Sequence, residues 1–215
     1  MRSAVRTLIA AWFLLILLVA INHGFGNRPG TPPLALGTAF LAPILLFVAA
    51  LKFVPAFRTY VLQINPIFLA ALHGWRFVGL GFIMAYSEHL LSASFALPAA
   101  IGDIAVAFIC PWIVLRLATD NQFARGSSFV AWNLFGIADF ISAVALGALN
   151  QGFLPAFQPP VPSTLMGRLP FVLIPCFFVP WLFITHIILL MQRTAANHSY
   201  RNASAGRTLA ADPLG

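Results

Sequence analysis

Charged residues are the scarcest class in this chain, because aspartate, glutamate, lysine and arginine together make up only 8% of its 215 residues. A soluble protein carries charge on about a quarter of its residues. Hydrophobic residues make up 60% of the chain, and its mean hydropathy is +0.92. These values fit a lipid bilayer as the solvent of the chain and little else.

Basic clusters, paired cysteines and catalytic signatures are missing as well. The net charge is +7, but the basic residues are spread one or two to a loop, which argues against nucleic acid as a partner. Cys110 and Cys176 fall inside different apolar stretches, so we expect two free thiols and no disulfide. The sequence contains no HExxH, GxSxG, P-loop or complete GxGxxG motif. None of these motifs therefore points to an enzyme.

Long apolar segments are what the chain has instead, and there are six of them. Each is long enough to cross the hydrocarbon core as an α-helix, which takes about 20 residues. The segments are 7–22, 34–54, 66–86, 99–118, 129–149 and 171–191. We therefore predict an all-α polytopic membrane protein, with one bundle of six transmembrane helices over residues 1–191 and a disordered cytoplasmic tail at 192–215.

Basic residues between these segments predict the orientation. Nine Lys and Arg residues fall on the side of the two termini, whereas the opposite side carries Arg28 and Arg168. The positive-inside rule then places both termini in the cytoplasm. The first segment follows Arg2 and Arg6 and so also resembles a signal peptide, for which an uncleaved anchor is the preferred interpretation.

Two charged residues lie deep in the apolar segments, where a charge costs about 2.5–3.5 kcal/mol at the bilayer centre. Arg76 and Asp139 each lie ten residues from the cytoplasmic end of their segment, which places both near the midplane. We therefore predict an ion pair between the third and fifth helices. Such a pair either fixes helix packing or lines a gated path for a proton or substrate. A third alternative leaves Asp139 protonated and Arg76 bonded to backbone carbonyls.

Two histidines and an asparagine extend this predicted polar core. His73 lies three residues before Arg76 on the same helix face, and His186 is expected at a similar depth in the sixth segment. Asn133 lies in the fifth segment. Three interpretations of the histidines are open: axial ligands of a b-type haem, a shared proton path, or hydrogen-bonded packing.

A second polar cluster is expected on the outer side. Glu88, His89 and Asp103 fall near the ends of the third and fourth segments, and His23 follows the first. Oxygen and imidazole ligands suit a divalent metal, although their spacing forms no metal motif. The other interpretation is solvated loop residues, with Asp103 at a helix start where the helix dipole favours an anion.

The middle of the chain carries a resemblance. The stretches 95–106 (FALPAAIGDIAV), 132–133 (WN) and 136–140 (GIADF), together with His73 and Arg76, resemble a group of small, uncharacterised bacterial multi-pass integral membrane proteins. The resemblance implies a location in the bacterial cytoplasmic membrane and implies no activity.

The function that these residues predict is that of a small transporter or permease-like protein in the lipid bilayer. Asp139 would exchange between Arg76 and a proton, an ion or a small-molecule substrate, with no cofactor. Prolines within the helices would allow the motion. One alternative is a membrane redox subunit that binds haem b through His73 and His186. The other is a structural or accessory subunit in which the ion pair only holds helices together.

Overall fold

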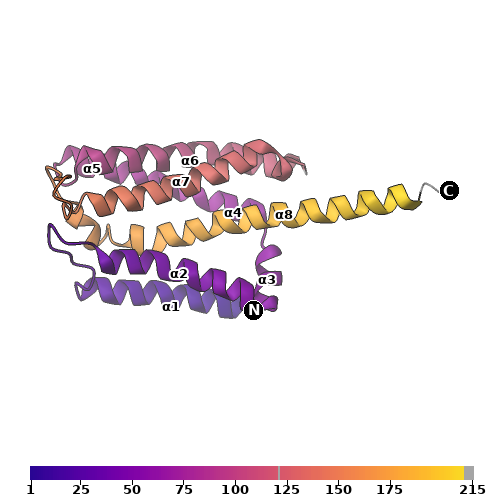
Figure 1. Cartoon of the computed structure of the whole chain (residues 1–215), viewed down its shortest axis with the longest axis horizontal. Coiled ribbons are helices and arrows are strands. Elements are labelled where there is room, and N and C mark those ends of the chain that lie inside the picture. Colours follow the sequence, from indigo (N-terminus) through magenta and orange to yellow (C-terminus); the bar gives the residue numbers. More distant parts are fainter. Residues whose placement is uncertain (121, 211–215) are drawn as a thin grey trace.

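The computed structural model describes the backbone of residues 1–120 and 122–210 and the side chains of residues 1–120 and 122–195. Within this part of the chain the fold is all-helical, and six helices are long and apolar enough to cross a membrane (Figure 1). The predicted all-α class is confirmed, and the number of helices long and apolar enough to span a membrane is the six predicted. The spanning elements are α1 (Arg2–Ile21), α2 (Leu34–Phe53), α4–η1–α5 (Pro66–Ala71, Leu72–Gly79 and Leu80–Ser87), α6 (Ala93–Thr119), α7 (Ser127–Leu149) and η4–α8 (Ile174–Phe178 and Val179–Ala210).

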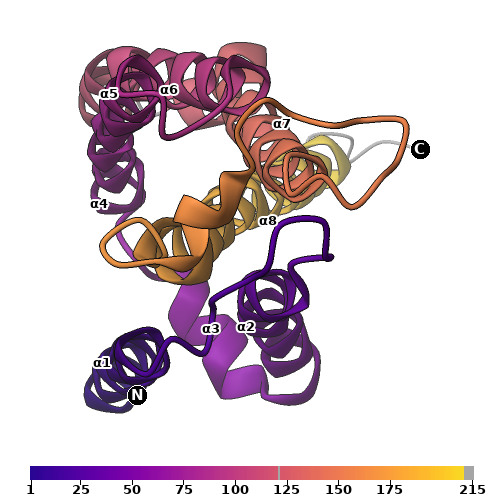
Figure 2. The ribbon, with the colours of Figure 1, turned by 90° about the vertical axis from the view of Figure 1, so that its left-hand side faces the viewer.

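The six spans run side by side as one bundle. Viewed along the bundle, α5, α6 and α7 lie on one side, α1 and α2 lie on the other, and α8 lies between them (Figure 2). Accordingly α8 contacts α2, α4 and α7, whereas α1 contacts the remainder mainly through η4. The start of α1 and the end of α8 lie at the same end of the bundle (Figure 1). The side of the membrane on which that end lies stays a prediction.

Helix α6 begins earlier than the sequence predicted. It starts at Ala93 and not at residue 99, and Pro98 lies inside it. Proline lacks an N–H and so forfeits one backbone hydrogen bond, but in an apolar solvent the helix continues around it. Asp103 therefore lies ten residues beyond the helix start, which is about 15 Å along the axis.

Two of the spans are not regular α-helices. The third changes to a 3₁₀-helix over Leu72–Gly79, which is long for this conformation, and the last begins with a π-helical turn at Ile174–Phe178. The sequence predicted an ordinary helix at the first place and a helix kinked by proline at the second. It also missed the short helix α3 (Pro55–Leu62), which follows α2 directly at Pro55.

Helix α8 extends beyond the predicted end of the bundle. It continues to Ala210, where the sequence predicted a disordered tail from residue 192. Alanine and arginine recur in this stretch, and both favour helix. Residues 211–215 of the predicted tail lie outside the described residues.

The apolar core is divided by a polar layer. Along α6, buried apolar residues form one run from Phe95 to Ala100 and a second from Val106 to Ile113, with Asp103 between them. The two runs belong to separate hydrophobic clusters. Cys110 and Cys176 are buried free thiols, as predicted. The polar residues of the predicted core therefore lie between two apolar layers.

Candidate functional site

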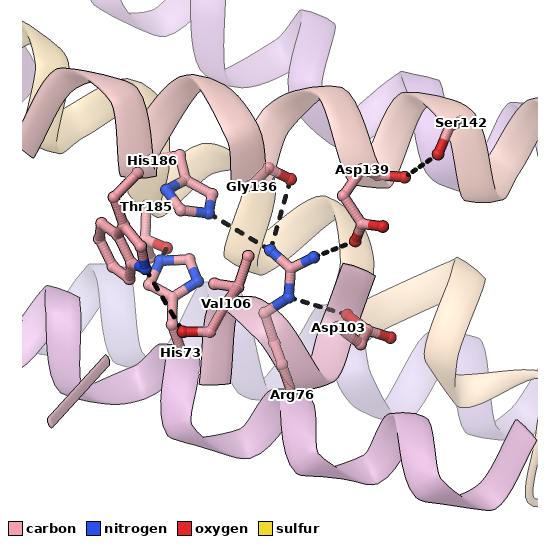
Figure 3. Close-up of polar contacts among 10 residues, drawn as sticks. His73, Arg76, Asp103, Val106, Gly136, Asp139, Ser142, Thr185 and His186 are labelled. Carbon is pink, nitrogen blue, oxygen red and sulfur yellow. Dashed lines mark hydrogen bonds and ion pairs between the residues drawn. The ribbon is translucent and has the colours of Figure 1, made fainter. Parts of the chain in front are cut away.

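Arg76 lies at the centre of this polar layer, and only 1% of it is exposed. Its Nε donates to Asp103 Oδ1 at 2.8 Å, and its Nη2 donates to Asp139 Oδ2 (Figure 3). The arginine comes from η1 and the two carboxylates from α6 and α7, so three spans meet at one cation. The ion pair predicted between Arg76 and Asp139 is present, and Asp103 makes it an ion triad of these three residues.

The remaining surface of the Arg76 guanidinium is also in contact. Its Nη1 donates to the Gly136 carbonyl at 3.3 Å and lies 3.4 Å from His186 Nε2. Its plane lies over the Phe140 ring, 3.8 Å from the ring centroid. A hydrogen bond from Arg76 to a backbone carbonyl was predicted only for the alternative without an ion pair. In the structure the bond to the Gly136 carbonyl is present together with both ion pairs.

Glycines provide the space for the triad. A Cβ added at Gly102 would overlap the Asp139 carboxylate, and one at Gly136 would overlap the His186 ring. A Cβ at Gly79 would lie 2.7 Å from the Cβ of Asp103. Small residues let helices approach closely enough for such contacts. The sequence did not predict a role for these glycines. Their signal is proximity to the triad, because Gly102 directly precedes Asp103 and Gly136 lies three residues before Asp139.

The hydrogen bonds of His186 fix its tautomer. Its Nδ1 lies 2.9 Å from Asn133 Oδ1, while Asn133 Nδ2 donates to the Phe129 carbonyl at 2.8 Å. Because that carbonyl only accepts, Asn133 Oδ1 is an acceptor and His186 Nδ1 carries the hydrogen. His186 Nε2 then presents a lone pair to Arg76. The ring is neutral and belongs to the same network as the triad.

His73 takes the opposite tautomer. Thr185 Oγ1 donates to the Leu182 carbonyl at 2.7 Å, so it accepts from His73 Nε2 at 3.0 Å. His73 Nδ1 is buried and has no hydrogen-bond partner within the described part of the chain. Of the four ring nitrogens of the two histidines, it is the one without a hydrogen-bond partner in that part of the chain.

The two histidine rings are in contact, at the similar depth that the sequence predicted for them. Their centroids are 3.8 Å apart and the rings are stacked at 29°, with Trp132 edge-on to both. Two axial ligands of a haem must face each other across the macrocycle, and stacked rings in contact leave no room for one. This arrangement does not fit a haem ligated by His73 and His186.

The predicted outer cluster is not brought together. Glu88, His89 and His23 are exposed, and both histidines have φ of 57° in turns that follow helix ends. Asp103 belongs instead to the ion triad, because α6 begins before Pro98 and carries this residue into the bundle. Among the described residues, no group of three or more His, Cys, Asp or Glu side chains is placed to hold a metal ion.

Fold and site together define a class: an all-helical protein with six helices apolar enough to span a membrane and a buried ion triad between them. The family described as a domain of unknown function, DUF8737, matches residues 32–192, and the chain belongs to this family. The match includes every residue of the triad and of the histidine pair, and leaves α1 outside. No curated protein matches the chain, and no solved structure does.

Proposed function

We propose that this protein is a small multi-pass transporter of the bacterial cytoplasmic membrane, with both termini in the cytoplasm, and that its ion triad binds and releases a proton during transport. The observation that carries this proposal is the composition of the triad. One arginine faces two aspartates in a layer enclosed by apolar side chains.

Charge balance is the first argument for a proton. With both carboxyls ionised, one positive and two negative charges leave the triad with a formal charge of −1. An unbalanced charge is strongly disfavoured at low dielectric. A single proton restores neutrality, and it belongs to the coupled pair of carboxyls, not to one residue. A triad that takes up one proton when at rest can exchange that proton for another cation.

Helix irregularity is the second argument. Arg76 lies in the 3₁₀ segment η1, and the π-helical turn η4 precedes the part of α8 that supplies His186. Interrupted helices adjoin the substrate and ion sites of many transporters, because their hydrogen-bond pattern is able to change locally. The spans that carry the cation and its histidine neighbour are therefore the two that contain a stretch of non-α helix.

A structural role is the alternative that the same contacts favour. Every hydrogen-bonding nitrogen of Arg76 has a partner, and three spans meet there, so the triad also holds the bundle together. The double variant Arg76→Asp with Asp139→Arg would test the role of an isolated ion pair. It does not separate the two roles in this triad. An aspartate at position 76 would lie against Asp103 and repel it.

Infrared spectroscopy tests the charge balance directly. In nanodiscs, the wild-type protein should show the C=O stretch of a protonated carboxyl at neutral pH. Asp103→Asn and Asp139→Asn should each abolish that band, because the remaining aspartate balances Arg76. The matched control is Asp120→Asn, which changes a carboxyl that pairs with Arg116 at the end of α6. A band that survives both triad variants contradicts the proposal.

Proton flux separates the transporter from the structural role. In liposomes that enclose a pH-sensitive dye, the wild-type protein should dissipate a proton gradient, and Asp139→Asn should not. Asp120→Asn should retain the wild-type flux. If Asp139→Asn inserts normally and still carries protons at the wild-type rate, the transporter proposal is wrong and the structural role remains.

A further inference from the structure

An apolar cavity of about 80 Å³ adjoins the ion triad. It lies between α2 and α7 and is also lined by residues from α5, α6, η3 and the start of the last span. Its lining residues are mainly apolar and aromatic, including Phe40 of α2, Phe82 of α5, and Phe140 and Ala143 of α7. Asp103 is the charged residue in its wall, so the cavity places an apolar chamber against a carboxylate of the triad.

Of the two carboxylates of the triad, that of Asp103 lines this cavity, whereas Asp139 Oδ1 lies against Gly102 of α6. Asp103 bonds Arg76 through Oδ1 and Asp139 bonds it through Oδ2. The second oxygen of each points away from the histidines and toward the Ser142 end of α7 (Figure 3). The α7 residues that come after Ser142, between Ala143 and Ala148, line the cavity on this side. Neither of the two oxygens has a hydrogen-bond donor within the described side chains.

From this juxtaposition we propose that the cavity binds a small alkylammonium ion, with the alkyl group in the apolar chamber and the ammonium group on the free oxygen of Asp103. The inference rests on the proposed function, because the ammonium replaces the proton that otherwise balances the triad. Proton and substrate then compete for one negative charge, which is the coupling that an exchange of the two requires.

The chemistry of the walls selects an organic cation over a metal ion. Calcium takes six to eight oxygen ligands and magnesium six, whereas this cavity offers one carboxylate, that of Asp103, and apart from Gln151 its polar lining is small. An alkylammonium ion has three N–H donors and an apolar tail, so it needs fewer oxygen ligands than either metal ion. The cavity has about half the volume of the roughly 150 Å³ cavity that binds benzene. A short alkyl chain therefore fits better than a large ring system.

The test uses the protonated-carboxyl band of the full-length protein in nanodiscs. At constant pH, n-butylammonium chloride should reduce the band in a saturable manner, because the bound ammonium displaces the shared proton. Equal concentrations of n-butanol and of sodium chloride should leave the band unchanged. Ala143→Phe fills the chamber and should abolish the response while the band itself remains. Ala145→Phe, the same change on the exposed face of α7, should retain the response.

The outcomes distinguish this inference from the proposed function. If the band is present but butylammonium does not reduce it, the triad holds a proton and the substrate assignment is wrong. The assignment is also wrong if butanol acts equally, or if Ala143→Phe responds like the wild-type protein. Without any band, the proposed function and the inference fall together.

Phe40→Ala, on α2, is a second variant that enlarges the chamber, and it should increase the response to n-hexylammonium. An unchanged response would place the ligand elsewhere.

Discussion

Replacing Arg76 should destabilise the protein far more than replacing either aspartate of the triad. Arg76→Gln removes both ion pairs, the bond to the Gly136 carbonyl and the contact with the Phe140 ring. It leaves two carboxyls in a buried site with no cation. Removing one partner of a buried ion pair typically costs about 3–5 kcal/mol, and we expect the upper part of that range because two carboxyls lose their partner.

The aspartate variants should cost less because the site stays neutral in them. Asp103→Asn leaves the 1:1 pair of Arg76 and Asp139, and the new amide still accepts a hydrogen bond from Arg76 Nε. The expected loss is below the roughly 1.5–3 kcal/mol of a hydrogen bond to a charged group. Removing all three charges, with Met at 76 and Leu at 103 and 139, should recover much of the stability lost in Arg76→Gln, because no uncompensated charge remains.

The free energy of unfolding can be measured by titrating the protein in mixed micelles with sodium dodecyl sulfate. Tryptophan fluorescence reports the transition, since Trp132 packs edge-on against both histidines. We expect the order wild type, Asp103→Asn, Arg76→Gln from most to least stable. If Arg76→Gln unfolds no more easily than Asp103→Asn, the arginine does not hold two carboxylates together and the charge argument fails.

Glycine packing, the histidine tautomers and the membrane orientation can each be tested separately. Gly102→Ala should cost about 1–3 kcal/mol, because its Cβ overlaps the Asp139 carboxylate, whereas Gly81→Ala, in open space, should be neutral or stabilise by up to about 1 kcal/mol; micelle unfolding of both variants checks this. Nitrogen-15 spectra should show His186 protonated at Nδ1 and His73 at Nε2, and a shared tautomer would contradict the network. Alkaline phosphatase fused in the loop between α1 and α2 should be active, and fused in the loop between α6 and α7 it should be inactive; the reverse pattern would invert the orientation.

Depth within the membrane could be predicted from the sequence, because it depends only on the helix rise and on where an apolar segment begins. Arg76 and Asp139 were placed at one depth in this way, and so were His73 and His186. Their contacts follow because a buried charge or imidazole requires a partner at its own depth. The functional role of these residues stays a prediction.

Lateral contacts could not be predicted in the same way. Hydropathy does not say which helices are neighbours, so Asp103 was not recognised as the second partner of Arg76. An error in depth added to this, because the predicted start of the fourth helix at residue 99 left Asp103 near the outer surface. The 3₁₀ segment was missed because no local signal in Leu72–Gly79 distinguishes it from an α-helix. Its packing against α6 is a tertiary property.

The 3₁₀ segment also has a mechanical consequence. His73, Arg76 and Gly79, its buried residues, are spaced by three and therefore lie in one row, because a 3₁₀-helix has about 3.0 residues per turn. In an α-helix each step of three falls about 60° short of a full turn, and the rise per residue drops from about 2.0 to 1.5 Å. Rewinding these eight residues would shorten the span by about 4 Å and turn Arg76 out of line with His73. Such an exchange of i→i+3 for i→i+4 hydrogen bonds would therefore change the position of the guanidinium relative to both aspartates at once.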